Sequence, residues 1–166
     1  MDTLVSQSDL EKLAAEVGAR LLESKRYLAV AESCTGGWVG QCLTAIAGSS
    51  HWFDCGFVTY TNVAKTKMLG VPDFTIRRHG AVSEPTARAM AEGALRGSQA
   101  AWSLAITGVA GPGGGSARNP VGTVCFAWAE RDGGCVAETC HFEGDRMAVR
   151  SQSVRHALAG LLARLA

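Results

Sequence analysis

Two adjacent nucleophilic side chains, Ser33 and Cys34, occupy a sharp bend between an apolar run and a segment with helical periodicity. The bend, residues 32–37, consists mostly of small residues and ends in Gly36 and Gly37, which let the backbone turn tightly and present N–H groups at the start of a helix. Such donors stabilise a developing oxyanion, so the hydroxyl or the thiol is a candidate nucleophile. The same residues also suit an ordinary helix cap with a tight turn, and the spacing leaves both interpretations open.

A candidate base, Lys65, falls in the first turn of a helix expected over residues 62–69, just after a strand that ends at Tyr60. The positive end of a helix dipole disfavours a cation at this position. That field, combined with burial, would lower the pKa of the amine and provide a neutral base. The alternative is a solvated lysine beside Lys67, and the spacing does not exclude it.

A glycine-rich segment, residues 107–116, follows another expected strand. Glycines at this density can bring a row of backbone N–H groups against a phosphate. The segment is neither a Walker A loop nor a strict G-x-G-x-x-G motif, because Ser116 occupies the last position of the latter. A flexible surface loop is the competing interpretation.

Two arginines, Arg146 and Arg150, lie four residues apart at the start of the last expected helix and therefore share one face. Guanidinium groups placed in this way can clamp a phosphate or a carboxylate. A solvated helix face would explain the same pair.

The histidines and the remaining cysteines give weaker signals. His79, His141 and His156 have no G-x-S-x-G serine to pair with, so a hydrolase triad of that kind is not supported. Cys135, Cys140 and His141 could suggest a metal site, but the adjacent Cys140 and His141 point to opposite faces of a strand. Zinc is not expected at these three residues.

Helices and strands alternate along the chain. Helical periodicity covers residues 9–24, 38–46, 62–69, 84–95 and 145–165, and strand-like runs cover 27–31, 53–60, 102–107, 121–129 and 135–142. Ser8 and Glu11 predict a capping box for the first helix, and Ser83 predicts the N-cap of the fourth. The order predicts an α/β fold: one domain over residues 1–166, with three α/β/α layers and a mixed, mostly parallel sheet of about five strands.

Composition limits the classes of function. The 166 residues suffice for one core, and 47% apolar with 19% charged residues is typical of an ordinary globular protein. A net charge of +1 argues against a nucleic-acid partner, and the absence of a long apolar run argues against a membrane partner. Because the N-terminus does not resemble a secretory signal, we expect the six cysteines to be reduced in a cytoplasmic protein.

Taken together and in this order, the motifs resemble the CinA C-terminal domain family, the nicotinamide-nucleotide amidohydrolases also called PncC. The matching segments are residues 31–38, 47–50, 56–62 with Lys65, 79–85, 107–115, 120–123 and 144–146. They extend over nearly the whole chain, and their combination makes the match specific. The chain looks like the stand-alone form, so any activity of the N-terminal domain found in full-length CinA should be absent.

The resemblance implies hydrolysis of the carboxamide of nicotinamide mononucleotide to nicotinic acid mononucleotide and ammonia. The family's catalytic serine, tyrosine and lysine correspond to Ser33, Tyr60 and Lys65. Our hypothesis is that Lys65, directly or through Tyr60, deprotonates Ser33, with no metal or other cofactor. We expect the substrate to be bound by the residues of the bend, the glycine-rich loop and the last helix: Cys34, Thr35, Gly36, Gly37, Thr107, Gly108, Gly111, Gly113, Gly114, Arg146 and Arg150.

The sequence leaves alternatives for the nucleophile and for the function. The thiol of Cys34 is an alternative nucleophile, and a non-catalytic module that binds a phosphorylated nucleotide is the alternative function. Small α/β enzymes of this kind are often homo-oligomers, so we also expect self-association.

Overall fold

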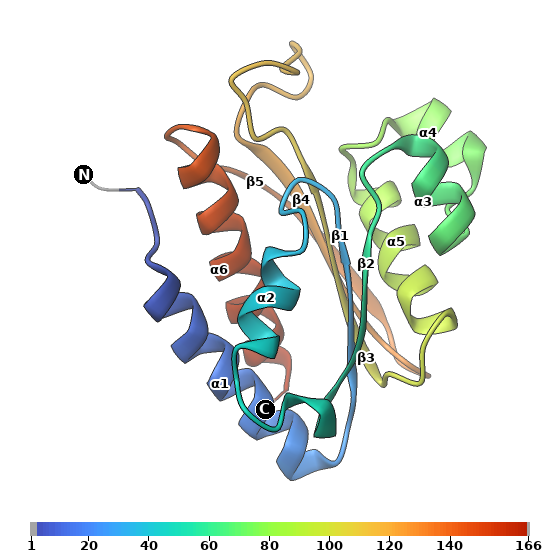
Figure 1. Cartoon of the computed structure of the whole chain (residues 1–166). Helices are drawn as coiled ribbons and strands as arrows, with labels where there is room; N and C mark the ends of the chain where they lie inside the picture. Colours follow the sequence, from blue (N-terminus) through green and yellow to red (C-terminus); the bar gives the residue numbers. More distant parts are fainter. Residues whose placement is uncertain (1–2, 166) are drawn as a thin grey trace.

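The computed structural model describes residues 3–165 and places a five-stranded sheet between two layers of helices (Figure 1). The strands are β1 (Leu28–Glu32), β2 (Phe53–Val58), β3 (Trp102–Gly108), β4 (Thr123–Glu130) and β5 (Cys135–His141). The helices are α1 (Gln7–Ser24), α2 (Trp38–Thr44), α3 (Asn62–Leu69), α4 (Asp73–His79), α5 (Glu84–Arg96) and α6 (Arg146–Arg164), with a short 3₁₀ turn at Ser49–His51.

The strand order is β2-β1-β3-β4-β5. Strands β2, β1 and β3 pair in parallel, β4 is antiparallel to β3, and β5 is antiparallel to β4. Only β4 therefore runs against the others. The predicted mixed, mostly parallel sheet is confirmed.

Each face of the sheet has its own apolar core. In β1, Leu28 and Val30 pack toward α1, α2 and α6, whereas Ala29 and Ala31 pack toward α5. This strand is buried on both faces, which explains its continuous apolar sequence. Figure 1 shows α1, α2 and α6 on one side of the sheet and α3, α4 and α5 on the other, so the predicted three layers are confirmed.

The predicted capping box at Ser8 and Glu11 is wrong. The N-cap of α1 is Ser6, whose side chain accepts a hydrogen bond from the backbone N–H of Asp9. Ser6 and Asp9 form the same kind of spaced pair two residues earlier, so helix propensity alone could not choose between them. By contrast, Ser83 caps α5 as predicted.

Some boundaries also differ from the sequence prediction. Helix α4 was not predicted, because its seven residues are too few to establish a period and they follow Pro72 directly. Strand β2 ends at Val58 rather than at residue 60, and β4 begins at Thr123 rather than at residue 121. Both differences lengthen the loops at one edge of the sheet.

That edge collects the segments in which chemistry was expected. Strands β1, β2 and β3 are parallel, so the bend after β1, residues 59–61 after β2 and the glycine-rich loop after β3 all emerge there. The glycine-rich loop projects beyond the sheet at the top of Figure 1. None of the helices within residues 3–165 combines the length and apolar character needed to cross a bilayer.

Candidate active site

Ser33 and Lys65 meet in a direct, buried contact. The Nζ atom of Lys65 lies 3.0 Å from Ser33 Oγ and donates a second hydrogen bond to the backbone carbonyl of Thr59 at 2.9 Å. Lys65 is 2% exposed and Ser33 is 8% exposed. The alternative of a solvated lysine is therefore excluded.

The start of α3 explains how a lysine comes to be buried here. Thr61 caps the helix by accepting from the N–H of Ala64, which places Lys65 in the first turn. No salt bridge reaches Lys65 from any described residue. Burial lowers the pKa of Lys65 from its usual value, an effect that the nearby Cys34 only partly opposes. This favours a neutral amine whose lone pair can accept the proton of the Ser33 hydroxyl.

The thiol of Cys34 is in a different environment. It lines the same cavity as Ser33, yet it is 6% exposed and packs into the apolar core on the α1, α2 and α6 side. Burial raises the pKa of Cys34 to about 12, so the thiol stays protonated near neutral pH. Of the two candidate nucleophiles, Ser33 is the one in hydrogen-bonding contact with the amine of Lys65.

A buried carboxylate that sequence analysis missed, Glu32, holds the bend in place. It accepts hydrogen bonds from the N–H groups of Val39 (2.9 Å) and Gly40 (3.1 Å) and from the hydroxyl of Thr35 (2.7 Å). It thereby satisfies the first turn of α2, which has no side-chain N-cap. The signal in the sequence was an acidic residue that ends an otherwise apolar strand.

The two glycines of the bend are required by its backbone conformation. Gly36 has φ +60° and Gly37 has φ +100°, the left-handed region that other residues rarely adopt. The N–H of Gly36 donates to the carbonyl of Ser33 at 3.0 Å. Within residues 3–165, the N–H groups of Thr35 and Gly37 have no acceptor.

Arg150 reaches the bend from α6. It donates to the carbonyls of Cys34 (3.0 Å) and Thr35 (3.2 Å), and its guanidinium lies 5.4 Å from the centroid of the Trp38 ring. These contacts tie the bend that carries Ser33 to a helix far along the chain.

Arg146 connects two other parts of the site. Its guanidinium donates to the carbonyl of Gly111 at 2.7 Å and to the hydroxyl of Tyr60 at 2.9 Å. Both predicted arginines thus lie at the expected edge with structural partners. Arg150 is part-buried, whereas Arg146 is exposed, so the alternative of a solvated helix face still describes Arg146 in part. Tyr60 is 60% exposed and is bonded to Arg146, whereas Lys65 contacts Ser33 without an intermediary.

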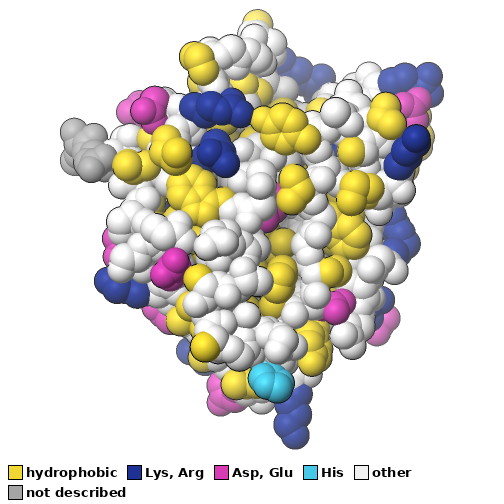
Figure 2. Space-filling view, viewed as in Figure 1, with side chains coloured by type: hydrophobic (Ala, Val, Ile, Leu, Met, Phe, Trp, Pro, Cys, Tyr) yellow, Lys and Arg dark blue, Asp and Glu magenta, His cyan; other side chains and the backbone are white. Residues whose placement is uncertain are grey.

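A cavity of about 230 Å³ opens over the Ser33–Lys65 pair. It is lined by Ser33, Cys34, Tyr60, Asn62, Lys65, Ala81, Val82, Thr107, Gly108, Ala110 and Arg146. A second cavity of about 650 Å³ shares Ala110 and Arg146 with the first and is also lined by Arg150. Figure 2 shows basic and hydrophobic side chains close together at the upper end of the molecule, where β1 and β2 end.

The predicted binding residues fall into two groups. Cys34, Thr107, Gly108 and Arg146 line the first cavity, and Arg150 lines the second. The others are outside both linings: Thr35, Gly36, Gly37, Gly111, Gly113 and Gly114. The predicted binding residues did not include Asn62, Ala81, Val82 and Ala110, which also line the cavity, although all four lie in segments that resemble the family.

The chain matches the family model described as the CinA C-terminal domain over residues 10–165. It is 48% identical over 157 residues to the nicotinamide-nucleotide amidohydrolase PncC of Escherichia coli strain K12, covering 95% of each protein. It is also 48% identical over 151 residues to the protein of that name from Pseudomonas putida, covering 90% of this chain and 93% of the relative. The crystal structure of the competence/damage inducible protein CihA from Agrobacterium tumefaciens superposes with a TM-score of 0.91 at 44% identity, covering 98% of both chains.

Proposed function

The chain belongs to the CinA C-terminal domain family, and from this premise we propose that it hydrolyses the carboxamide of nicotinamide mononucleotide to nicotinic acid mononucleotide and ammonia. The names of its relatives supply the substrate. The observation that carries the chemistry is the buried contact of 3.0 Å between Ser33 Oγ and Lys65 Nζ. A serine with a neutral amine as its base is a recognised arrangement for acyl transfer.

In the first half of the reaction, neutral Lys65 takes the proton of Ser33 as the oxygen attacks the amide carbon. The tetrahedral intermediate collapses when the amide C–N bond breaks, and the Lys65 ammonium protonates the departing nitrogen to give ammonia. An ester between Ser33 and the nicotinoyl group remains. In the second half, neutral Lys65 activates a water molecule, which cleaves this ester, releases the carboxylate product and restores the Ser33 hydroxyl.

The bend provides donors for the oxyanion of the intermediate. The N–H groups of Thr35 and Gly37 have no acceptor among residues 3–165, whereas that of Gly36 is occupied by the Ser33 carbonyl. We assign the oxyanion to these donors: Thr35 and Gly37 do not line the cavity themselves, but they belong to the bend whose residues Ser33 and Cys34 do. Each donor contributes about 3 kcal/mol of transition-state stabilisation in comparable sites.

The arginines provide the binding site for the 5′-phosphate. Arg146 lines both cavities, and Arg150 lines the larger one beside it. The carbonyl partners of the two guanidinium groups hold them at the cavities, leaving further N–H donors for a phosphate. The glycine-rich loop, held against Arg146 through Gly111, completes this end of the site. A phosphate anchored there fixes the amide near Ser33.

The proposal is tested by mixing the purified protein with nicotinamide mononucleotide and measuring ammonia together with the mass of the nucleotide product. We expect both products, Ser33→Ala to abolish turnover and Cys34→Ala to retain it. A non-catalytic nucleotide-binding module would bind the nucleotide without releasing ammonia, which would refute the proposal. Loss of turnover in Cys34→Ala with retention in Ser33→Ala would instead identify the thiol as the nucleophile.

A further inference from the structure

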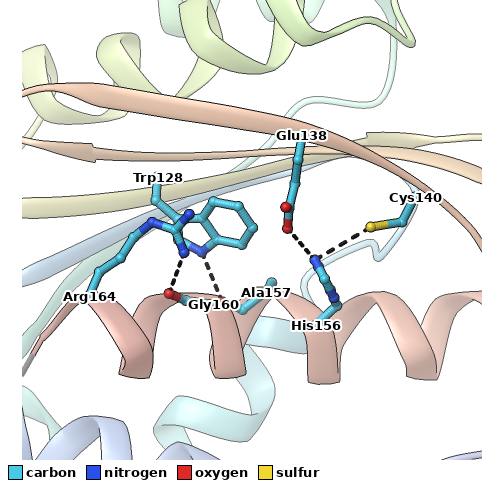
Figure 3. A network of polar contacts seen from close by, with 7 residues as sticks. All are labelled: Trp128, Glu138, Cys140, His156, Ala157, Gly160 and Arg164. Carbon is cyan, nitrogen blue, oxygen red and sulfur yellow. Dashed lines mark hydrogen bonds and ion pairs between the residues drawn. The ribbon is translucent and has the colours of Figure 1, made fainter.

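Three metal-ligating side chains meet outside the cavity, where the edge strand β5 packs against α6 (Figure 3). Glu138 and Cys140 lie two residues apart on β5 and share the face toward α6, which contributes His156. His156 Nε2 lies 2.5 Å from Glu138 Oε1 and 3.5 Å from Cys140 Sγ, and one ligand atom from each residue falls within 4.8 Å of the others. None of the three lines the cavity over Ser33.

The arrangement differs from a nucleophile triad. In a triad the acid and the nucleophile contact opposite nitrogens of the imidazole. Here the carboxylate and the thiol both approach Nε2, so the three ligand atoms surround a common point. Convergence on one point is what ligation of an ion requires.

We propose that Glu138, Cys140 and His156 bind a divalent metal ion of the zinc class, with water as the fourth ligand. Carboxylate oxygen, thiolate sulfur and imidazole nitrogen are the donors that zinc accepts, and a site with three protein ligands keeps one position for water. The thiolate and the carboxylate together balance the charge of the ion, and the protons of the thiol and of the His156–Glu138 contact leave as it binds.

The distances fit this geometry with one adjustment. Tetrahedral bonds of about 2.0 Å to nitrogen and about 2.3 Å to sulfur put the two ligand atoms roughly 3.5 Å apart, and Nε2 and Sγ are already 3.5 Å apart. The Glu138 oxygen must retreat from Nε2 to make room. Its side chain is 44% exposed and that of His156 is 34% exposed, so the carboxylate is free to move and an ion can reach the site from solvent.

The scaffold already holds the imidazole in place. The His156 ring lies 4.6 Å from that of Phe126 between centroids. Beside it, the indole N–H of Trp128 donates to the carbonyl of Ala157 at 3.0 Å, which links β4 to α6. Gly160 allows this close approach, because a Cβ there would be 2.3 Å from the Trp128 ring (Figure 3). A ligand held by packing in this way is preorganised for the ion.

The neighbouring histidine is not part of the site. His141 follows Cys140 on β5, but its Nδ1 pairs with the hydroxyl of Thr123 at 3.2 Å. The sequence argument against Cys140 and His141 as joint ligands therefore still holds. The third ligand comes from a helix, which strand spacing could not reveal.

Cobalt(II) is a suitable probe, because a thiolate bound to it gives a ligand-to-metal charge-transfer band. Untagged protein, treated with a chelator and kept reduced, is titrated with Co²⁺, and Zn²⁺ is then added. We expect a band that saturates at one ion per chain and that Zn²⁺ abolishes. Failure to observe a saturable band would overturn the proposal.

Variants locate the ion. Cys140→Ser and His156→Gln should lose the band, whereas the control Cys135→Ser, altered on the opposite face of the same strand, should retain it. If His156→Gln is unfolded by circular dichroism, Cys140→Ser and Glu138→Gln decide, since both side chains are part-exposed. Zn²⁺ should also raise the thermal unfolding midpoint of the wild type and of Cys135→Ser, but not that of Cys140→Ser. Binding that persists in Cys140→Ser, or that Cys135→Ser also loses, refutes the assignment.

Discussion

Lys65 shows how burial can favour the neutral form of a residue that is usually charged at the surface. Its amine contacts a serine hydroxyl and a backbone carbonyl, and no carboxylate among the described residues compensates its charge. A buried ammonium without an anionic partner costs folding free energy, and this cost is what lowers the pKa of Lys65. The burial that costs folding free energy therefore also favours the neutral Lys65 amine that the proposed reaction needs.

Replacing Lys65 by methionine separates the proposed role of its amine as a base from the folding cost of burying that amine. Lys65→Met should lower kcat by roughly 10² to 10⁴-fold, the usual contribution of a general base, with little change in KM. In the wild type, kcat/KM should fall as the pH drops through the lowered pKa of Lys65, because the active form is the neutral amine. Steady-state kinetics as a function of pH checks both. A variant that kept wild-type turnover would show that another group is the base.

The free energy of unfolding of Lys65→Met should not decrease, in contrast to its kcat. In the unfolded chain the pKa of Lys65 is near its usual value, and in the folded protein it is lower. At pH values between these two pKa values, the unfolded state therefore binds more protons than the folded state. The free energy of unfolding consequently rises with pH across that window. The penalty for burying the ammonium is fully present below the pKa of the folded state. Methionine removes the penalty, so the urea unfolding free energy at neutral pH should not decrease. A large decrease would indicate a structural lysine.

Arg146 carries a prediction about specificity. Its guanidinium lies between Gly111 and Tyr60 at the junction of the two cavities. Arg146→Ala should raise KM for the mononucleotide by roughly 10 to 100-fold, the equivalent of one or two charged hydrogen bonds, and should reduce discrimination against the unphosphorylated riboside. Kinetics on both substrates, with Arg155→Ala on the exposed side of α6 as the control, measures this. An equal loss for both substrates would argue against a phosphate contact.

At the level of elements, the start of α2 and the bend before it form one unit. Glu32, the last residue of β1, accepts from two backbone N–H groups of α2 and from the hydroxyl of Thr35. A helix of seven residues is marginal on its own, so this carboxylate and Arg150 together determine where the bend lies. The position of Ser33 therefore depends on two groups that the proposed proton transfer does not use.

Glu32→Gln tests this positioning. The amide nitrogen of the glutamine is a donor, and it would face a backbone N–H of α2 that donates to the carboxylate in the wild type. One buried N–H group is then left without an acceptor. We expect a loss of about 1–3 kcal/mol of unfolding free energy and a lower kcat under conditions in which the variant is folded. Asp54→Asn is the matched control, because the part-buried Asp54 accepts from the N–H of Gln99 in a hydrogen bond that is exposed to solvent. If both variants lost stability while kcat stayed unchanged, the bend would not depend on Glu32.

For the whole molecule, what could be predicted from sequence depended on the range of the contacts. Local patterns were sufficient for the layered fold, for the N-cap at Ser83 and for the bend at Gly36 and Gly37. The parallel-strand rule was sufficient to bring Ser33 and Lys65 to one edge. The contacts of Arg150 with Cys34 and of Arg146 with Tyr60 join residues 116 and 86 positions apart, and no local pattern reports them.

The two helical layers contribute different parts of the site. Ser33 lies in the bend after β1, and Arg146 begins α6 on one face of the sheet, whereas Lys65 comes from α3 on the other face. The separation between Ser33 and Lys65 therefore depends on how the layer that contains α3 packs against the sheet. In that layer, Gly93 of α5 allows α3 to approach closely. A Cβ on Gly93 of α5 would lie 2.0 Å from the carbonyl oxygen of Leu69, the last residue of α3.

Gly93→Ala should therefore displace α3, and Lys65 with it. The added methyl must push against backbone, at a cost of about 1–3 kcal/mol that exceeds the gain of up to about 1 kcal/mol in helix propensity. Gly18→Ala is the matched control, because its Cβ would lie 2.5 Å from the Trp52 ring, at the opposite end of the sheet from the cavity. We expect both variants to lose urea unfolding free energy but only Gly93→Ala to lose kcat under native conditions. Equal activities at equal stabilities would mean that α3 accommodates the methyl without moving its lysine, and the proposed dependence of the site on layer packing would be wrong.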